Sequence, residues 1–201
     1  MQSLIRHARD YREIVSDRSG DFAALAEGQK PQGLFITCSD SRVVPALLTG
    51  AQPGELFEIR NAGNIVPPHG LRRPCGVAAT IEYAVTVLEV PDIVVCGHSH
   101  CAAVTAVVTD QDLSAMPAVR DWLRLAQPRP NAGKTTSGEA AGSVSAAIHE
   151  HVVAQLERLA EYPFVATRVR AGRLRLHGWF YEIDTGTVRT YSARERAFRP
   201  L

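Results

Sequence analysis

The chain has 201 residues, of which 45% are hydrophobic and 21% charged, values typical of a folded domain and not of a disordered or fibrous protein. Its 22 basic and 21 acidic residues leave a formal net charge of +1, which excludes the strong basic excess of a dedicated nucleic-acid-binding protein. Four cysteines are too few for a disulfide scaffold, so we consider them as metal ligands, nucleophiles or core residues. We expect one domain over residues 1–201.

No segment is predicted to cross a membrane. The longest apolar stretch, residues 77–90, is interrupted by polar residues and is shorter than the roughly 20 apolar residues that a span requires. The N-terminus has no apolar signal-peptide core. We therefore expect a cytoplasmic protein with no membrane partner, whose cysteines stay reduced.

Hydrophobic periodicity and turn residues predict the secondary structure. In chain order we expect a helix at 3–16, a short helix from an Asp21 cap to residue 26, a strand at 33–37, a helical turn at 45–49, a strand at 55–60, a long helix at 76–90, a strand at 92–96 and a helix at 102–108. A helix at 116–125, a surface loop at 128–142, helices at 144–159 and 163–171, a strand at 173–183 and a final strand at 188–191 follow. Residues 1 to about 28 would form a helical arm.

This alternation predicts an α/β fold with a central, mostly parallel β-sheet flanked by helices. We expect about four parallel strands plus one antiparallel edge strand. The segment 92–96 is apolar on both faces, so it should lie in the centre of the sheet. In such folds functional groups gather beyond the carboxyl ends of the strands, where the strand order reverses.

Potential zinc ligands follow two of these predicted strands. Cys38 comes after the first strand, and His98 and Cys101 come after the third. Two thiolates and one imidazole suit Zn²⁺, and three protein ligands leave the fourth tetrahedral position open, as in catalytic zinc sites. Cys101 would also begin a helix, whose dipole favours its thiolate. The spacing predicts one Zn²⁺ per chain.

Other cysteines and histidines must be weighed as a fourth ligand. Cys96 and His100 are close enough in sequence to be candidates; we expect Cys96 in the core and His100 pointing away from the site or lining its entrance. Cys75 is expected to pack before a helix. The remaining histidines have no ligand spacing and are expected on the surface or hydrogen-bonded in the core: His7, His69, His149, His151 and His177.

Asp40 and Arg42 follow Cys38 at alternating positions. A carboxylate beside a metal-bound water can accept or orient its proton. An arginine fork can hold that carboxylate in place and keep it ionised. We interpret the pair as catalytic and not as an ordinary surface ion pair, because it lies next to a predicted ligand.

At these residues the sequence resembles the β-class carbonic anhydrases. Cys38-Ser-Asp-Ser-Arg42 and His98-Ser-His-Cys101 are similar to the two signature segments of that family. The resemblance covers the chain from about Gln29 to Tyr191, and the subgroup resembled is the plant-like one, which also occurs in bacteria beside cyanate-degrading enzymes. Three further segments carry it: Glu55-Leu-Phe-Glu-Ile-Arg-Asn-Ala-Gly-Asn64, Ile81-Glu-Tyr-Ala84 and His177-Gly-Trp-Phe-Tyr-Glu-Ile183.

The resemblance implies a zinc enzyme that interconverts carbon dioxide and bicarbonate. Cys38, His98 and Cys101 would bind the zinc, and Asp40 and Arg42 would form the catalytic dyad. The family's pocket lies at a dimer interface, so the resemblance also implies a homodimer or tetramer. The substrate-binding positions that match are Gln29, which would hydrogen-bond the substrate, Phe57 and Tyr83, which would form apolar walls, and Ala62, where plant members carry Val.

Three positions depart from patterns known in the family. Ala102 replaces the Gly that usually follows the last ligand, and Cys75 stands where small residues are common. Neither change removes a catalytic group. Some members have a non-catalytic bicarbonate pocket that needs a Trp where this chain has Phe35, so we do not expect that regulation.

Zinc lowers the pKa of its bound water, and the resulting hydroxide would attack carbon dioxide in a small apolar pocket. Two thiolates cancel the charge of the ion, so we predict a less acidic water and a rate that rises into the alkaline range. Two alternatives stay open. The same site could hydrolyse carbon disulfide or carbonyl sulfide, or Cys96 or His100 could fill the fourth position of a non-catalytic zinc-binding or redox scaffold.

Overall fold

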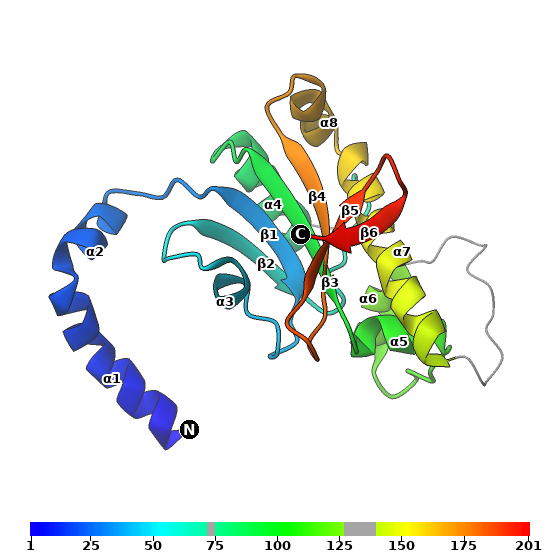
Figure 1. The fold of residues 1–201 in the computed structure, drawn as a ribbon, viewed down its shortest axis with the longest axis horizontal. Helices are drawn as coiled ribbons and strands as arrows, with labels where there is room; N and C mark the ends of the chain where they lie inside the picture. Colours follow the sequence, from blue (N-terminus) through cyan, green and yellow to red (C-terminus); the bar gives the residue numbers. More distant parts are fainter. Residues whose placement is uncertain (72–74, 127–139) are drawn as a thin grey trace.

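The computed structural model describes residues 1–71, 75–126 and 140–201. Within these residues, six strands form one mixed sheet in the order β2-β1-β3-β4-β5-β6 (Figure 1). The first four are parallel: β1 (Gly33–Cys38), β2 (Leu56–Asn61), β3 (Asp92–His98) and β4 (Arg175–Tyr181). The two that end the chain are antiparallel: β5 (Val188–Ser192) and β6 (Ala197–Pro200). The predicted fold class is confirmed.

The strand order reverses between β1 and β3. The chain passes from β1 to β2 on one side and then returns to place β3 on the other side of β1. Every residue of β1 is buried, and β3 pairs with both β1 and β4, so the predicted central position of the third strand is confirmed. The carboxyl ends of β1 and β3 therefore meet at the crevice where α/β folds bind ligands.

Eight α-helices lie within the described residues. They are α1 (Gln2–Asp17), α2 (Ser19–Ala26), α3 (Pro45–Thr49), α4 (Gly76–Thr86), α5 (Ala102–Val108), α6 (Pro117–Leu123), α7 (Ala140–Glu161) and α8 (Pro163–Arg170). A 3₁₀ turn at Arg124–Ala126 extends α6. The main core joins apolar side chains of β1 and β3 to those of α4, α7 and α8, which cover the same face of the sheet. No described helix is both long and apolar enough to cross a membrane.

Helix α7 packs closely on β3 and β4 because glycines face it there. A Cβ built on Gly97 would lie 2.6 Å from Cγ2 of Val152 and 3.2 Å from Cγ2 of Ile148. A Cβ on Gly178 would lie 2.8 Å from Cδ1 of Leu156. Glycine at these positions lets α7 approach the sheet beside the end of β3, and this approach places the middle of the helix next to the loop that follows β2.

The N-terminal helices project from the sheet as an arm (Figure 1). Neither α1 nor α2 contains a buried residue. The apolar side chains of α1 are exposed or nearly so, among them Leu4, Tyr11 and Ile14, which are 66%, 44% and 44% exposed. An amphipathic helix normally buries such a stripe, so this arm has an apolar face that the described chain does not cover.

Several predicted boundaries were wrong for physical reasons. Helix α4 ends at Thr86 and not at residue 90, because Glu89 takes a left-handed φ of 51° and Pro91 follows. Asp21 does not cap α2; it lies in the first turn, where its carboxylate accepts from Nε of Arg18 at 3.1 Å. Strand β5 is not the last, since β6 pairs with it at the edge, where Pro200 is tolerated.

Part of the predicted surface loop at 128–142 lies outside the described residues. Residues 140–142 instead begin α7, so this helix starts earlier than the apolar pattern at 144–159 indicates.

Candidate active site and metal centre

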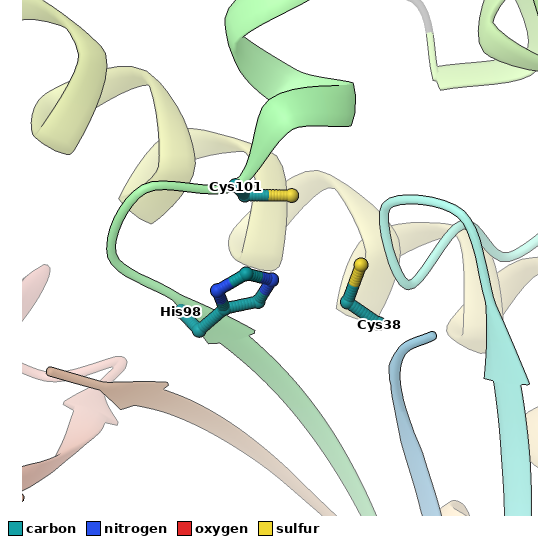
Figure 2. Close-up of side chains that lie close together, drawn as sticks. All are labelled: Cys38, His98 and Cys101. Atoms are coloured by element: carbon teal, nitrogen blue, oxygen red, sulfur yellow. The ribbon is translucent and has the colours of Figure 1, made fainter. Parts of the chain in front are cut away.

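Two strand ends and one helix start bring three potential metal ligands together (Figure 2). Cys38 is the last residue of β1, His98 is the last residue of β3, and Cys101 immediately precedes α5. All three are buried, and their ligand atoms lie within 4.8 Å of one another. Among the described residues, this is the one group of three or more His, Cys, Asp or Glu side chains that could hold a metal ion.

The orientation of His98 leaves one ring nitrogen available to a metal. Its Nδ1 lies 2.8 Å from the carbonyl oxygen of Ser99, which can only accept, so Nδ1 carries the proton. The other nitrogen, Nε2, is buried without a hydrogen-bond partner. A buried polar atom with no partner is costly, and a metal ion beside the two sulfur atoms would satisfy it. The donor set therefore fits zinc.

Each of the two thiols changes the pKa of the other. The pKa of Cys38 is lowered to about 4 because the neighbouring Cys101 stabilises its thiolate, with smaller contributions from His98 and from the N–H of Gly63; burial acts in the opposite direction. The Cys38 thiolate and burial raise the pKa of Cys101, and this outweighs the stabilising N–H groups at the start of α5. A bound cation removes this competition, because it favours both thiolates.

Asp40 and Arg42 form a bidentate ion pair beside the three ligands. Nε of Arg42 donates to Oδ1 of Asp40 at 2.9 Å and its Nη2 donates to Oδ2 at 2.8 Å. The main-chain N–H of Arg42 donates to Oδ1 as well, at 3.0 Å. The arginine holds the pKa of Asp40 well below its usual range, against the opposing effect of partial burial. Asp40 is therefore a carboxylate at neutral pH.

Arg60, near the end of β2, holds the loop that carries these residues. Its Nη2 donates to the carbonyl oxygens of Cys38 at 3.1 Å, Asp40 at 2.8 Å and Val43 at 2.7 Å. Sequence reasoning missed this role. The one signal was a charged residue just before the predicted Asn61-Ala-Gly-Asn64 turn, which does not reveal which carbonyl groups it meets.

The other candidate ligands lie outside the three-residue group. Cys96 is fully buried in β3, and burial raises the pKa of its thiol to about 12. His100 has a left-handed φ of 58° and turns outward, with a side chain 59% exposed and Nε2 2.7 Å from Oδ2 of Asp184. Cys75 immediately precedes α4. Neither Cys96 nor His100 is placed to be a fourth ligand.

Comparison with known proteins agrees with this geometry. A family model for carbonic anhydrase matches residues 33–188. The chain is 48% identical over 195 residues to a carbonic anhydrase of Pseudomonas aeruginosa, and this match spans 96% of this chain and 88% of that protein. The structure of the present chain matches that of the β-carbonic anhydrase CcaA with a TM-score of 0.89 and 38% identity, over 100% of this chain and 99% of the other. The chain belongs to the β-class carbonic anhydrases.

Two further comparisons agree with membership of this family. Carbonic anhydrase 1 of Escherichia coli O157:H7 is 46% identical over 191 residues, covering 94% of this chain and 87% of that protein. A structure from a study of two tetrameric β-carbonic anhydrases of Sordaria macrospora matches with a TM-score of 0.82 and 30% identity, covering 94% of each chain. The cyanate-associated subgroup stays a prediction.

In a single chain of this carbonic anhydrase, three of the four expected substrate-binding residues lie away from the metal centre. Phe57 pairs with Leu34, four residues before Cys38, a separation of about 13 Å along the sheet. The ring of Tyr83 lies 6.0 Å from that of Phe57, and Gln29 is exposed before β1 begins. Ala62 alone is near, because it follows Asn61, the residue paired with Cys38.

Proposed function

We propose that this enzyme catalyses the reversible hydration of carbon dioxide to bicarbonate and a proton, with one Zn²⁺ held by Cys38, His98 and Cys101. The observation that carries the proposal is the unpartnered, buried Nε2 of His98, in a group of one histidine and two cysteines whose ligand atoms lie within 4.8 Å of one another. Three protein ligands are the number found in catalytic zinc sites. When bound, zinc supplies a nucleophile at neutral pH, because it lowers the pKa of a coordinated water.

Asp40 would accept or orient the proton of this water. Oδ1 accepts two hydrogen bonds from Arg42, whereas Oδ2 accepts one and keeps a second lone pair for a hydrogen-bonded water or substrate hydroxyl. Arg42 would keep the carboxylate ionised and fixed in orientation. Asp40 and Arg42 therefore form the proposed catalytic dyad. They follow Cys38 in the chain, which places them beside the proposed zinc.

A second copy of the chain would complete the substrate pocket. Phe57 lies about 13 Å along the sheet from Cys38, Tyr83 packs against Phe57 and is 45% exposed, and Gln29 precedes the opposite end of β1. The uncovered apolar face of the N-terminal arm, at about residues 1–28, supports the same proposal, since a partner subunit would bury it. We propose a homodimer or a tetramer in which each subunit places Gln29, Phe57 and Tyr83 beside the Ala62 loop of the other.

The non-catalytic alternative is less favoured by the geometry. A closed zinc or redox scaffold needs a fourth ligand, and Cys96 and His100, its two candidates, both lie outside the group of ligand atoms. Hydrolysis of carbon disulfide or carbonyl sulfide would use the same zinc and dyad. No feature of the described residues favours these substrates over carbon dioxide.

Two measurements on the same purified sample test the proposed function. Metal analysis should find one zinc per chain, and stopped-flow assays should detect carbon dioxide hydration that stops when a chelator removes the zinc. One zinc per chain without hydration would support the scaffold. A protein that binds no zinc would rule out both enzymatic readings. Carbon disulfide and carbonyl sulfide should be assayed in parallel.

A further inference from the structure

Helix α7 presents two buried polar side chains to the loop after β2. His151 is 9% exposed and Gln155, one turn further along, is fully buried. Both find their partners in that loop: Nε2 of His151 lies 2.7 Å from the carbonyl oxygen of Gly63, and Oε1 of Gln155 accepts from the N–H of Val66 at 2.9 Å. Buried polar groups without such partners would destabilise the fold, so these bonds fix the loop against α7.

The direction of the hydrogen bond from His151 is determined by its partner. The carbonyl oxygen of Gly63 can only accept, so Nε2 of His151 carries a proton and donates. Burial lowers the pKa of His151, which keeps the ring neutral and leaves Nδ1 as an acceptor. That nitrogen lies 3.4 Å from Nε2 of Gln155, which donates. The order of donation is therefore from Gln155 to His151 to Gly63.

A second donor holds the other side of Gly63. Nε1 of Trp122, on α6, donates to the carbonyl oxygen of Ala62 at 2.9 Å. This carbonyl and the N–H of Gly63 belong to one peptide unit, which is planar, so fixing one end of it orients the other. The carbonyl of Gly63 belongs to the next peptide unit, which His151 holds. Trp122 and His151 thus restrain both peptide planes that flank Gly63.

The N–H oriented in this way points at a proposed metal ligand. Gly63 donates to Sγ of Cys38 at 3.4 Å, and this bond is among the causes of the lowered pKa of Cys38. Gly63 itself has a left-handed φ of 79°, and a Cβ there would lie 3.1 Å from Cβ of Ala103. The conformation that directs the N–H to sulfur therefore suits glycine.

We propose that Trp122 and His151 are positioning residues that hold the Gly63 N–H on the Cys38 sulfur and so set the electron donation of this thiolate to the metal. The inference rests on the proposed zinc site. Neither side chain belongs to the proposed ligand set; each acts through the Gly63 peptide units. A hydrogen bond to a thiolate withdraws electron density from sulfur, and groups that orient ligands in this way commonly change metal affinity.

The test uses Trp122→Phe, which removes the N–H donor and keeps the aromatic ring, and His151→Leu, which removes the donor on α7. In the cobalt-substituted full-length enzyme, each variant should move the sulfur-to-cobalt charge-transfer band to lower energy, because the Cys38 thiolate becomes more electron-rich. Zinc affinity, measured by competition with a chelator, should change by on the order of 10-fold. Hydrogen exchange of the Gly63 amide should become about tenfold faster.

Two further variants separate positioning from packing. His151→Gln keeps an N–H donor at this position, so its charge-transfer band should stay near the wild-type energy and its Gly63 amide should exchange near the wild-type rate. This variant gives a result even if His151→Leu does not fold. Leu159→Val trims a fully buried core residue on the same helix and should leave both readouts unchanged. Wild-type band positions and wild-type Gly63 exchange in Trp122→Phe, and in His151→Leu where that variant folds, would overturn the inference.

The outcome is distinguishable from failure of the proposed function. If the wild-type chain bound neither zinc nor cobalt, the proposed function would fail. Exchange at the Gly63 amide requires no metal, so it would still decide whether Trp122 and His151 position this group. Unchanged exchange in Trp122→Phe would then overturn the positioning role, and faster exchange would support it.

Discussion

Nη2 of Arg42 donates to the carbonyl oxygen of His100 at 3.3 Å, and this bond joins the loop after β1 to the loop after β3. The same guanidinium holds both oxygens of Asp40. One side chain therefore connects the carboxylate to the segment that precedes the Cys101 ligand. Hydrogen bonds therefore join the proposed dyad to the segment between the proposed ligands His98 and Cys101.

Asp40→Asn should retain one zinc per chain and lose carbon dioxide hydration by roughly 10²–10⁴-fold, because the amide cannot accept a proton as the carboxylate does. Arg42→Lys should show a smaller loss, since lysine keeps the charge and loses the planar fork. Stopped-flow hydration and metal analysis on the same samples check this. A fully active Asp40→Asn enzyme would remove Asp40 from the mechanism.

Cys38→Ser and Cys101→Ser should each lose zinc and hydration, because a serine hydroxyl is a poor zinc ligand compared with a thiolate. Cys75→Ser and Cys96→Ala are the matched controls. Both should keep one zinc per chain, and Cys96→Ala should lower only the stability, since it removes a buried side chain from β3. Zinc loss in Cys96→Ala with zinc retained in Cys101→Ser would contradict the ligand set.

The free energy of unfolding should fall as the pH drops below about 6.5. Burial lowers the pKa of His149 and of His151 from 6.5, so the unfolded chain binds protons there that the folded chain does not. The loss begins near the unfolded pKa and continues to the lower folded values, with a slope of at most about 1.4 kcal/mol per pH unit for each group.

Urea titrations at several pH values check this slope. His151→Gln removes one of the two groups, so its unfolding free energy should depend less steeply on pH between about 6.5 and the lower folded value. Asp40 acts in a different range: its lowered pKa contributes stability above the ordinary carboxyl pKa of 3.8 that is lost as the pH falls further. An identical slope in the wild type and His151→Gln would show that His151 does not titrate as proposed.

The N-terminal arm should control assembly. Leu4→Asp together with Ile14→Asp places charges on the apolar face of α1 and should shift the enzyme toward monomers, measured by light scattering on a size-exclusion column. The rate of carbon dioxide hydration should fall as the oligomer dissociates, because the proposed pocket uses Gln29, Phe57 and Tyr83 of a second copy. Arg9→Ala, an exposed and charged position of the same helix, is the control and should leave both unchanged.

Gly97→Ala should destabilise the fold by about 1–3 kcal/mol, because its Cβ would meet the stiff side chains of Val152 and Ile148 on α7. Gly20→Ala, in α2, is the matched control: nothing lies within 4 Å of its Cβ, so the substitution should be neutral or slightly stabilising. Thermal unfolding of both variants makes the comparison. Equal stability of the two would mean that α7 does not pack tightly at Gly97.

The amino-acid sequence by itself determined the parallel strands and the residues at their carboxyl ends. Apolar runs such as residues 92–96 are typical of central strands, and a Cys or His shortly after such a strand is expected at the edge of the sheet where α/β folds bind ligands. Local spacing therefore located Cys38, His98 and Cys101. It could not find β6, whose four residues include an arginine and a proline.

The tertiary structure alone decided which groups support that site. Arg60 meets the carbonyl groups of the Cys38 loop because β2 pairs with β1, and His151 meets Gly63 across 88 residues of sequence because glycines let α7 approach the sheet. Such contacts depend on how distant segments pack, and no local period encodes them. For the same reason, the sequence could name Phe57 and Tyr83 but could not show that they lie away from the metal centre of their own chain.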